Sequence, residues 1–102
     1  MNETPFTVLD EEKAGQLAEL FRSLSDPSRI RLISVMAKGE INVGSLAQQV
    51  GISESSASHH LRGLRQMRLV RARKEGRQVY YRLDDEHIAD LYQRGLDHIL
   101  HG

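Results

Sequence analysis

The chain has 102 residues, 39% of them hydrophobic and 27% charged, which predicts one small soluble domain and leaves no room for a second. The absence of cysteine excludes a disulfide framework and a thiolate metal site, so any metal must be bound by histidine and carboxylate. No apolar run approaches the roughly 18 residues that span a bilayer, and residues 1–10 do not resemble a signal peptide. We therefore expect a cytoplasmic protein with no membrane partner. A domain this small also gains from burying surface in a dimer.

The charges are unevenly distributed, although 14 basic and 14 acidic residues cancel over the whole chain. Between Arg62 and Arg82, eight basic residues stand against Glu75 alone, whereas residues 1–21 and 84–102 are both acidic. This segregation predicts one face that binds a polyanion, with acidic terminal elements kept away from it. The alternative is a solvated arginine-rich surface.

The first part of the chain predicts a short arm followed by two helices. Residues 1–9 have no helical pattern and are expected to be a flexible arm, so the folded domain covers residues 10–102. Apolar residues then recur at helical spacing from Asp10 onward. A second helix is predicted over residues 27–38, because Asp-Pro is a good helix start and Gly39 a natural stop.

The middle of the chain predicts a helix-turn-helix. A short third helix over residues 43–50 ends at Gly51, and Ser53 caps a fourth helix that is rich in Ser, His and Arg. A purely structural helical hairpin is the alternative. Residues 69–83 then alternate apolar and basic residues around a predicted turn at residues 74–77, as a β-hairpin with a basic tip does.

A last helix completes the pattern. Asp84 is the predicted N-cap, and the helix runs to about His101. The predicted fold is therefore mainly α with a small β-hairpin, in the order α-α-α-α-β-β-α. That order is typical of a winged helix-turn-helix, which here would form a homodimer and bind double-stranded DNA.

The predicted DNA contacts lie on the fourth helix and on the wing. Hydroxyl and imidazole groups of the helix can contact phosphates or base edges, and the basic residues of the wing can neutralise phosphates. His59 and His60 point about 100 degrees apart, so one of them can face DNA while the other packs inward. The candidates are Ser55, Ser56, Ser58, His59, Arg62, Arg73, Lys74 and Arg77.

The last helix carries four residues of the types that bind metal ions, namely Asp85, His87, His98 and His101. His87 and His98 are separated by about 16 Å along a helix, so one helix cannot place both on one ion. However, the pair 87 and 98 and the pair 85 and 101 are both centred near residue 93. Two copies of the helix packed antiparallel across a two-fold axis would therefore form two identical sites, and Gly95 lies near that crossing. The alternative is that the histidines decorate a polar helix face.

Three imidazoles and one carboxylate favour a tetrahedral zinc ion. Cobalt would also bind, and nickel would need further ligands. A zinc-dependent hydrolase is an alternative of another class, but four protein ligands leave no position for a water. We therefore expect no enzyme activity and no small organic substrate.

Four stretches of the sequence resemble the ArsR/SmtB family of bacterial metal-sensing repressors. The resemblance covers roughly residue 17 to the C-terminus, and its last helix matches the subgroup motif D-x-H, ten residues, H-x-x-(H or E) at Asp85, His87, His98 and His101. It implies a homodimeric repressor that binds operator DNA when metal-free and releases it when zinc binds between the subunits. The matching stretches are LSDPSRIR (24–31), VGSLA (43–47), SESSASHHL (53–61) and GRQVYY (76–81).

The chain also departs from the family pattern. Many members bind thiophilic metals through paired cysteines early in the third helix, whereas residues 40–45 here are EINVGS. The resemblance therefore does not extend to thiolate sensing of arsenic, cadmium or lead. Three alternatives stay open: a structural zinc site, a sensor of nickel or cobalt, and a protein-interaction module that no longer binds DNA.

Overall fold

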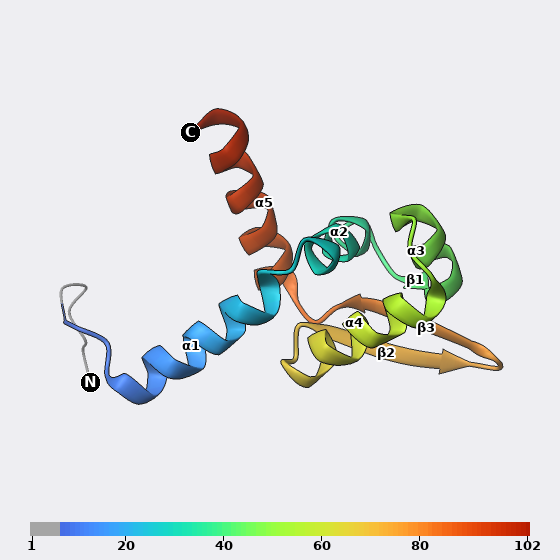
Figure 1. Ribbon diagram of the computed structural model, residues 1–102, viewed down its shortest axis with the longest axis horizontal. Coiled ribbons are helices and arrows are strands. Elements are labelled where there is room, and N and C mark those ends of the chain that lie inside the picture. Colours follow the sequence, from blue (N-terminus) through green and yellow to red (C-terminus); the bar gives the residue numbers. More distant parts are fainter. Residues whose placement is uncertain (1–6) are drawn as a thin grey trace.

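The computed structural model describes residues 7–102, which fold into helices around a small antiparallel sheet (Figure 1). The predicted mainly helical fold with a hairpin is confirmed, and the predicted arm at residues 1–9 lies mostly outside the described residues. The elements are α1 (Glu11–Leu24), α2 (Pro27–Met36), β1 (Ile41–Asn42), α3 (Val43–Val50), α4 (Glu54–Gln66), β2 (Val70–Glu75), β3 (Gln78–Leu83) and α5 (Glu86–His101).

Short polar side chains fix the starts of the first four helices. Asp10, Asp26, Asn42 and Ser53 each accept a hydrogen bond from a backbone N–H in the first turn, which satisfies donors that the helix itself leaves unpaired. The second helix ends two residues earlier than predicted, because the chain after Met36 tightens into a turn. These caps determine where α3 and α4 begin.

The core lies between the helix-turn-helix and the sheet. Gly51 links α3 to α4 in the left-handed region at φ 81°, which glycine adopts without strain, and so permits a turn of only a few residues. The largest fully buried side chains come from α2, α3, α4 and the residue before β2. They are Leu32, Ile33, Leu46, Leu61, Leu64 and Leu69.

The sheet has the strand order β1-β3-β2 and contains one strand that the sequence did not predict. Strand β1 has two residues and pairs with the end of β3, with Asn42 opposite Tyr80. The hairpin turn is also shorter than predicted, since Glu75 still pairs with Gln78 and only Gly76 and Arg77 form the turn. Gly76 lies at φ 61°, as a two-residue hairpin turn requires of one of its residues.

The predicted N-cap of α5 is wrong by one residue. Asp85, not Asp84, caps the helix, and its Oδ1 accepts a hydrogen bond from the backbone N–H of His87 at 2.8 Å. Asp84 instead accepts a hydrogen bond from Arg71 Nε of β2 at 2.6 Å. Because Asp84 is bound to Arg71 of β2, Asp85 is the aspartate that caps the helix.

Helices α1 and α5 project from the body of the protein, away from the tip of the hairpin (Figure 1). Neither helix contains a buried residue. Large apolar side chains on them are instead exposed, including Phe21 at 48% and Ile99 at 80%. Among residues 7–102, no helix is both long and apolar enough to cross a membrane.

Candidate nucleic-acid interface and metal-binding helix

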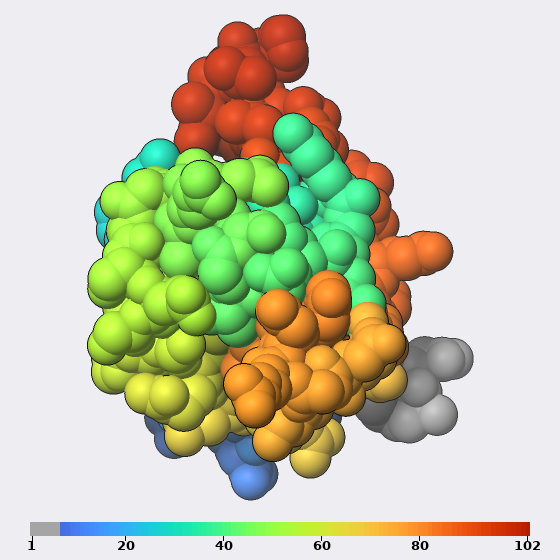
Figure 2. Space-filling model, turned by 90° about the vertical axis from the view of Figure 1, so that its right-hand side faces the viewer, coloured from blue at the N-terminus to red at the C-terminus, as the bar shows by residue number. Residues whose placement is uncertain are grey.

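The outer face of α4 presents polar side chains next to the hairpin. Ser55, His59 and Arg62 are all exposed and follow one another at helical spacing, so they share a face. Ser56 and Ser58 are partly buried, and the Ser56 backbone N–H donates to the capping Ser53 Oγ. Figure 2 shows α3, α4 and the tip of the hairpin on one side of the molecule. A helix and a basic hairpin tip can therefore approach one ligand together.

The two adjacent histidines of α4 have different surroundings. His59 is exposed, whereas His60 is partly buried and its Nδ1 accepts a hydrogen bond from Arg29 Nε of α2 at 3.3 Å. Arg29 also donates through Nη1 to the backbone carbonyl of Ser23 at 3.3 Å. Its guanidinium lies directly over Gly63, where a Cβ would come within 2.9 Å of the Arg29 Cζ. Arg29 thus connects α4 to α2 and to the end of α1.

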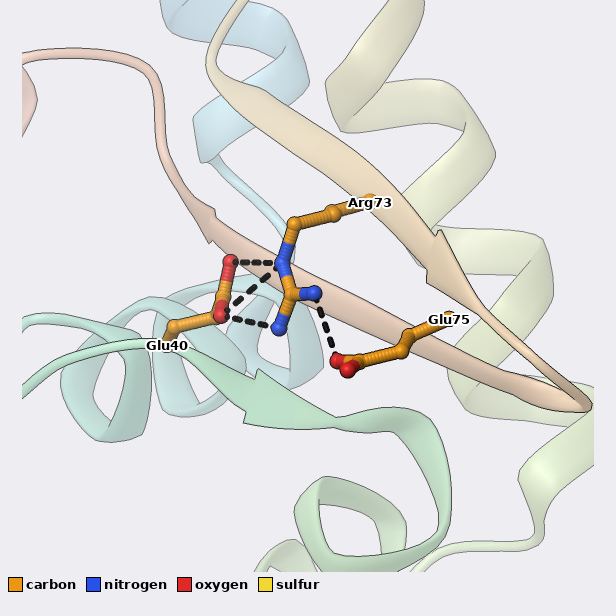
Figure 3. A network of polar contacts seen from close by, with 3 residues as sticks. All are labelled: Glu40, Arg73 and Glu75. Carbon is orange, nitrogen blue, oxygen red and sulfur yellow. Dashed lines mark hydrogen bonds and ion pairs between the residues drawn. The ribbon is translucent and has the colours of Figure 1, made fainter.

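The three basic residues predicted for the wing also differ. Lys74 and Arg77 are exposed, and within residues 7–102 no hydrogen bond or ion pair holds either side chain. Arg73 instead lies between two carboxylates (Figure 3), with Nη2 2.8 Å from Glu40 Oε1 and Nη1 2.7 Å from Glu75 Oε1. The hydrogen bonds with Glu40, and then those with Glu75, raise the pKa of the Arg73 guanidinium. The hydrogen bond from Arg73 lowers the pKa of Glu40 below its usual value.

The four predicted metal ligands lie in two pairs near the ends of α5. At the N-terminal end, His87 Nδ1 lies 3.3 Å from Asp85 Oδ1, and the His87 side chain is 91% exposed. At the C-terminal end, His98 and His101 are both exposed and lie three residues apart in the last turn of the helix. Within residues 7–102 of one chain, no three metal-binding side chains gather into a group that could hold an ion.

The carboxylate next to His87 is held in its charged form. The hydrogen bond from the His87 side chain, followed by backbone hydrogen bonds, lowers the pKa of Asp85 below its usual value. Asp84 already accepts the Arg71 hydrogen bond and is the less available of the two neighbouring aspartates. An Asp85 carboxylate beside an imidazole is the type of oxygen and nitrogen donor pair that zinc accepts.

An apolar groove of about 270 Å³ separates α5 from the α1–α2 corner. It is lined by Leu24, Ile30 and Ile33 on one side and by α5 residues that include Leu91 and Ile99 on the other. Gly95 also lines it, and a Cβ at Gly95 would meet nothing within 4 Å in the described chain. Packing within one described chain therefore leaves room for a side chain at position 95 and does not explain why glycine is there. A glycine in the middle of a helix lowers its stability by about 1 kcal/mol relative to alanine.

Sequence reasoning missed the acidic partners of the basic wing. Glu40 is 33 residues from Arg73 in the sequence and meets it only through the sheet. Arg71 and Asp84 are 13 residues apart and join the wing to the start of α5. The hairpin register would have placed Arg71 near Asp84, whereas no local signal identifies Glu40.

The comparisons with known proteins agree with this arrangement. A family model described as "Bacterial regulatory protein, arsR family" matches residues 26–72, which include α2, α3 and α4. The "Transcriptional repressor SmtB homolog" of Synechocystis sp. is 48% identical over 92 residues, covering 90% of this chain and 70% of that protein. The chain belongs to the arsR family of bacterial regulatory proteins. It is a transcriptional regulator of the ArsR/SmtB type with a DNA-binding winged helix, and not an enzyme.

One further sequence relative and one solved structure resemble the chain over most of its length. The "Cadmium resistance transcriptional regulatory protein CadC homolog" of Staphylococcus aureus is 37% identical, over 88% of this chain and 75% of its own length. The solution structure of a "homodimeric winged helix-turn-helix DNA-binding domain" from Mycobacterium bovis has 30% identity and a TM-score of 0.76, covering 89% of this chain and 87% of its own. The winged helix-turn-helix predicted from the sequence is thus confirmed, while one relative is named for cadmium resistance and another as an antimony-specific repressor.

Proposed function

We propose that this protein is a zinc-responsive transcriptional repressor. Its metal-free homodimer binds operator DNA in the cytoplasm and leaves the DNA when zinc binds between the two α5 helices. The observation that carries the proposal is the division of four ligand-type side chains into two exposed pairs near the two ends of α5. Each pair is half of a zinc site, and a second copy of the chain supplies the other half.

The DNA surface in this proposal consists of α4 and the wing. Ser55, Ser56, Ser58, His59 and Arg62 lie along or beside the exposed face of α4 and would meet the major groove. Lys74 and Arg77 are unpaired within the described chain and would neutralise phosphates, so affinity falls steeply with salt. Arg73 was predicted to act in the same way, but it is bound to the carboxylates of Glu40 and Glu75.

The dimer surface consists of α1 and α5. Phe21 and Ile99 are exposed on helices that have no fully buried residue, and solvent exposure of such an apolar face is costly. The homodimer of the structural relative supports the same assembly. Antiparallel packing of the α5 helices near Gly95 would bring Asp85 and His87 of one subunit close to His98 and His101 of the other. Zinc fits this nitrogen and oxygen donor set, which also accepts cobalt and, with further ligands, nickel.

The route from metal to DNA starts at the residue before the proposed ligand Asp85. The Asp84 backbone N–H donates to the Leu69 carbonyl at 3.0 Å, and its carboxylate accepts the Arg71 hydrogen bond. The start of α5 is therefore attached to β2, the first strand of the wing. A shift of α5 on zinc binding would move the wing, and by reciprocity bound DNA would weaken zinc binding by the same factor.

Fluorescence anisotropy on DNA from upstream of the protein's own gene tests this function. We expect tight binding with chelator and at least tenfold weaker binding with stoichiometric zinc, at fixed salt. Asp85→Asn should abolish the zinc effect, whereas the matched control Asp90→Asn, an exposed aspartate on the same helix, should keep it. Tight binding that ignores zinc would show that the site is structural or serves another ion. Absence of salt-dependent DNA binding would contradict the repressor function itself.

A further inference from the structure

Arg73 occupies a different position from the other basic residues of the wing. It lies on β2 and reaches across the central strand β3 to Glu40, the residue before β1. Its guanidinium passes 4.7 Å from the ring centroid of Tyr80, the residue opposite it on β3. One side chain thereby connects the two edge strands of the sheet, β1 and β2, which have no hydrogen bonds to each other.

The hydrogen bonds engage three of the five N–H donors of Arg73, whose side chain is 49% exposed. Its Nε lies 3.3 and 3.2 Å from the two oxygens of Glu40, and Nη2 and Nη1 donate to Glu40 and Glu75 (Figure 3). The planar guanidinium fork is thus matched bidentately by one carboxylate and bound by a second. A phosphate would therefore have to bind through the two remaining N–H groups, next to two carboxylates.

The charge of the cluster also opposes phosphate binding. Two carboxylates surround one guanidinium, so the three side chains carry a net negative charge, and hydrogen bonding to Arg73 keeps Glu40 ionised. Lys74 and Arg77 lie beside this cluster at the tip and carry no such partner within residues 7–102. Arg82 lies close enough to Glu40 to offset part of this negative charge, so the unpaired tip is the stronger attraction for a phosphate near the wing.

Glu40 connects the cluster to the helix-turn-helix. Two residues later, Asn42 caps α3 and pairs with Tyr80, the residue beneath the Arg73 guanidinium. An ion pair at Glu40 therefore holds β2 to the segment from which α3 begins.

We propose that Arg73 is a positioning residue that braces the wing against the start of the helix-turn-helix through Glu40 and Glu75, and that Lys74 and Arg77 make the wing's phosphate contacts. This inference rests on the proposed function, because it concerns how the wing is presented to DNA. It assigns Glu40 and Glu75 a role in DNA binding although both are negatively charged. It also separates the role of Arg73, which positions the wing, from that of Lys74 and Arg77, which bind phosphates.

The salt dependence of DNA affinity separates a brace from a phosphate contact. Each neutralised phosphate adds about 0.9 to the slope of log affinity against log salt. Arg77→Gln should therefore lower the slope by about 1.8 in a dimer with two wings. Arg73→Gln should weaken binding about three- to tenfold while the slope changes by less than about 0.5. A slope loss for Arg73→Gln equal to that for Arg77→Gln would overturn the proposal.

The substitution Glu40→Gln changes DNA affinity in opposite directions, depending on whether Arg73 braces the wing or binds a phosphate. If Glu40 holds a brace, its loss weakens DNA binding about threefold or more, although a negative charge has been removed. If Glu40 only restrains a phosphate-binding arginine, its loss strengthens binding. Glu86→Gln removes the same charge from an exposed position on α5 and serves as the matched control, measured with chelator. Unchanged or tighter binding by Glu40→Gln would overturn the proposal.

Hydrogen exchange of the DNA-free protein tests the brace without reference to DNA. Glu40→Gln and Arg73→Gln should both speed exchange of the β2 and β3 amides, whereas Glu86→Gln and Arg77→Gln should leave it unchanged. Equal protection in all four variants would overturn the brace. If the wild-type protein fails to bind DNA while the exchange results hold, the proposed function fails and the brace itself stands.

Discussion

Gly63 lies beneath the guanidinium of Arg29, and replacing it with alanine tests how the DNA-binding helix α4 is held in place. A Cβ at this position would come within 2.9 Å of Arg29 Cζ and closer still to Nη2, so the arginine must move. Moving it breaks the hydrogen bonds to His60 Nδ1 and to the Ser23 carbonyl. The substitution therefore removes the polar contacts that link α4 to α2 and to the end of α1, while their apolar packing stays.

Two opposing effects set the magnitude. Alanine is better than glycine inside a helix by about 1 kcal/mol. Each hydrogen bond from the charged Arg29 contributes about 1.5 kcal/mol, a value at the low end because both are 3.3 Å long. Gly63→Ala should therefore lower the free energy of unfolding by about 2 kcal/mol. In an Arg29→Ala background no clash occurs, and the same substitution should raise it by about 1 kcal/mol.

The assay is urea unfolding followed by far-UV circular dichroism, with chelator and at one protein concentration because the stability of a dimer depends on concentration. Gly44→Ala is the matched control, since it lies on α3, outside the proposed dimer surface, and the atom nearest to a Cβ there is Asn42 Oδ1 at 3.5 Å, an ordinary contact. It should stabilise both backgrounds to the same extent. If Gly63→Ala stabilises the wild-type protein, or changes both backgrounds equally, the Arg29 attachment is refuted.

Three further predictions concern the dimer, the core and the coupling between metal and DNA. Phe21→Asp should dissociate the dimer, because it places a charge on an apolar face of α1, and light scattering should then give the 11.6 kDa of one chain; an unchanged dimer mass would contradict the assigned interface. Leu61→Ala should cost about 2–5 kcal/mol in urea unfolding, because the side chain is fully buried at 0% exposure, and a loss below about 1 kcal/mol would be inconsistent with that packing. Arg71→Gln should leave zinc affinity intact in a calorimetric titration but reduce zinc-induced DNA release, because it detaches β2 from Asp84; full release would rule out this route.

Local side-chain chemistry made most helix boundaries predictable. Asp10, Asp26 and Ser53 precede apolar residues at helical spacing, and each caps the helix predicted to follow it. The start of α5 was missed because Asp84 and Asp85 are equally good caps. The choice between them depends on Arg71, which approaches Asp84 only once the hairpin has formed. Strand β1 was missed because two residues have no periodicity.

The candidate site was predictable to different degrees. Exposure of His59 and of the wing tip follows from helical and strand periodicity, which the sequence displays directly. The partner of Arg73 could not be predicted, since Glu40 belongs to a distant segment that the sheet brings close. The metal ligands were proposed from a family motif and an assumed two-fold axis, because within residues 7–102 of one chain no three of them come together.

A mixed dimer tests the central claim most directly. One variant carries Asp85→Asn, which can still cap α5, together with His87→Ala; the other carries His98→Ala and His101→Ala. Each homodimer then has two half-sites, whereas a heterodimer purified by two tags has one complete site. Zinc should release DNA from the heterodimer and from neither homodimer. A heterodimer that stays on DNA with zinc, or a homodimer that leaves it, would contradict a zinc site shared between subunits.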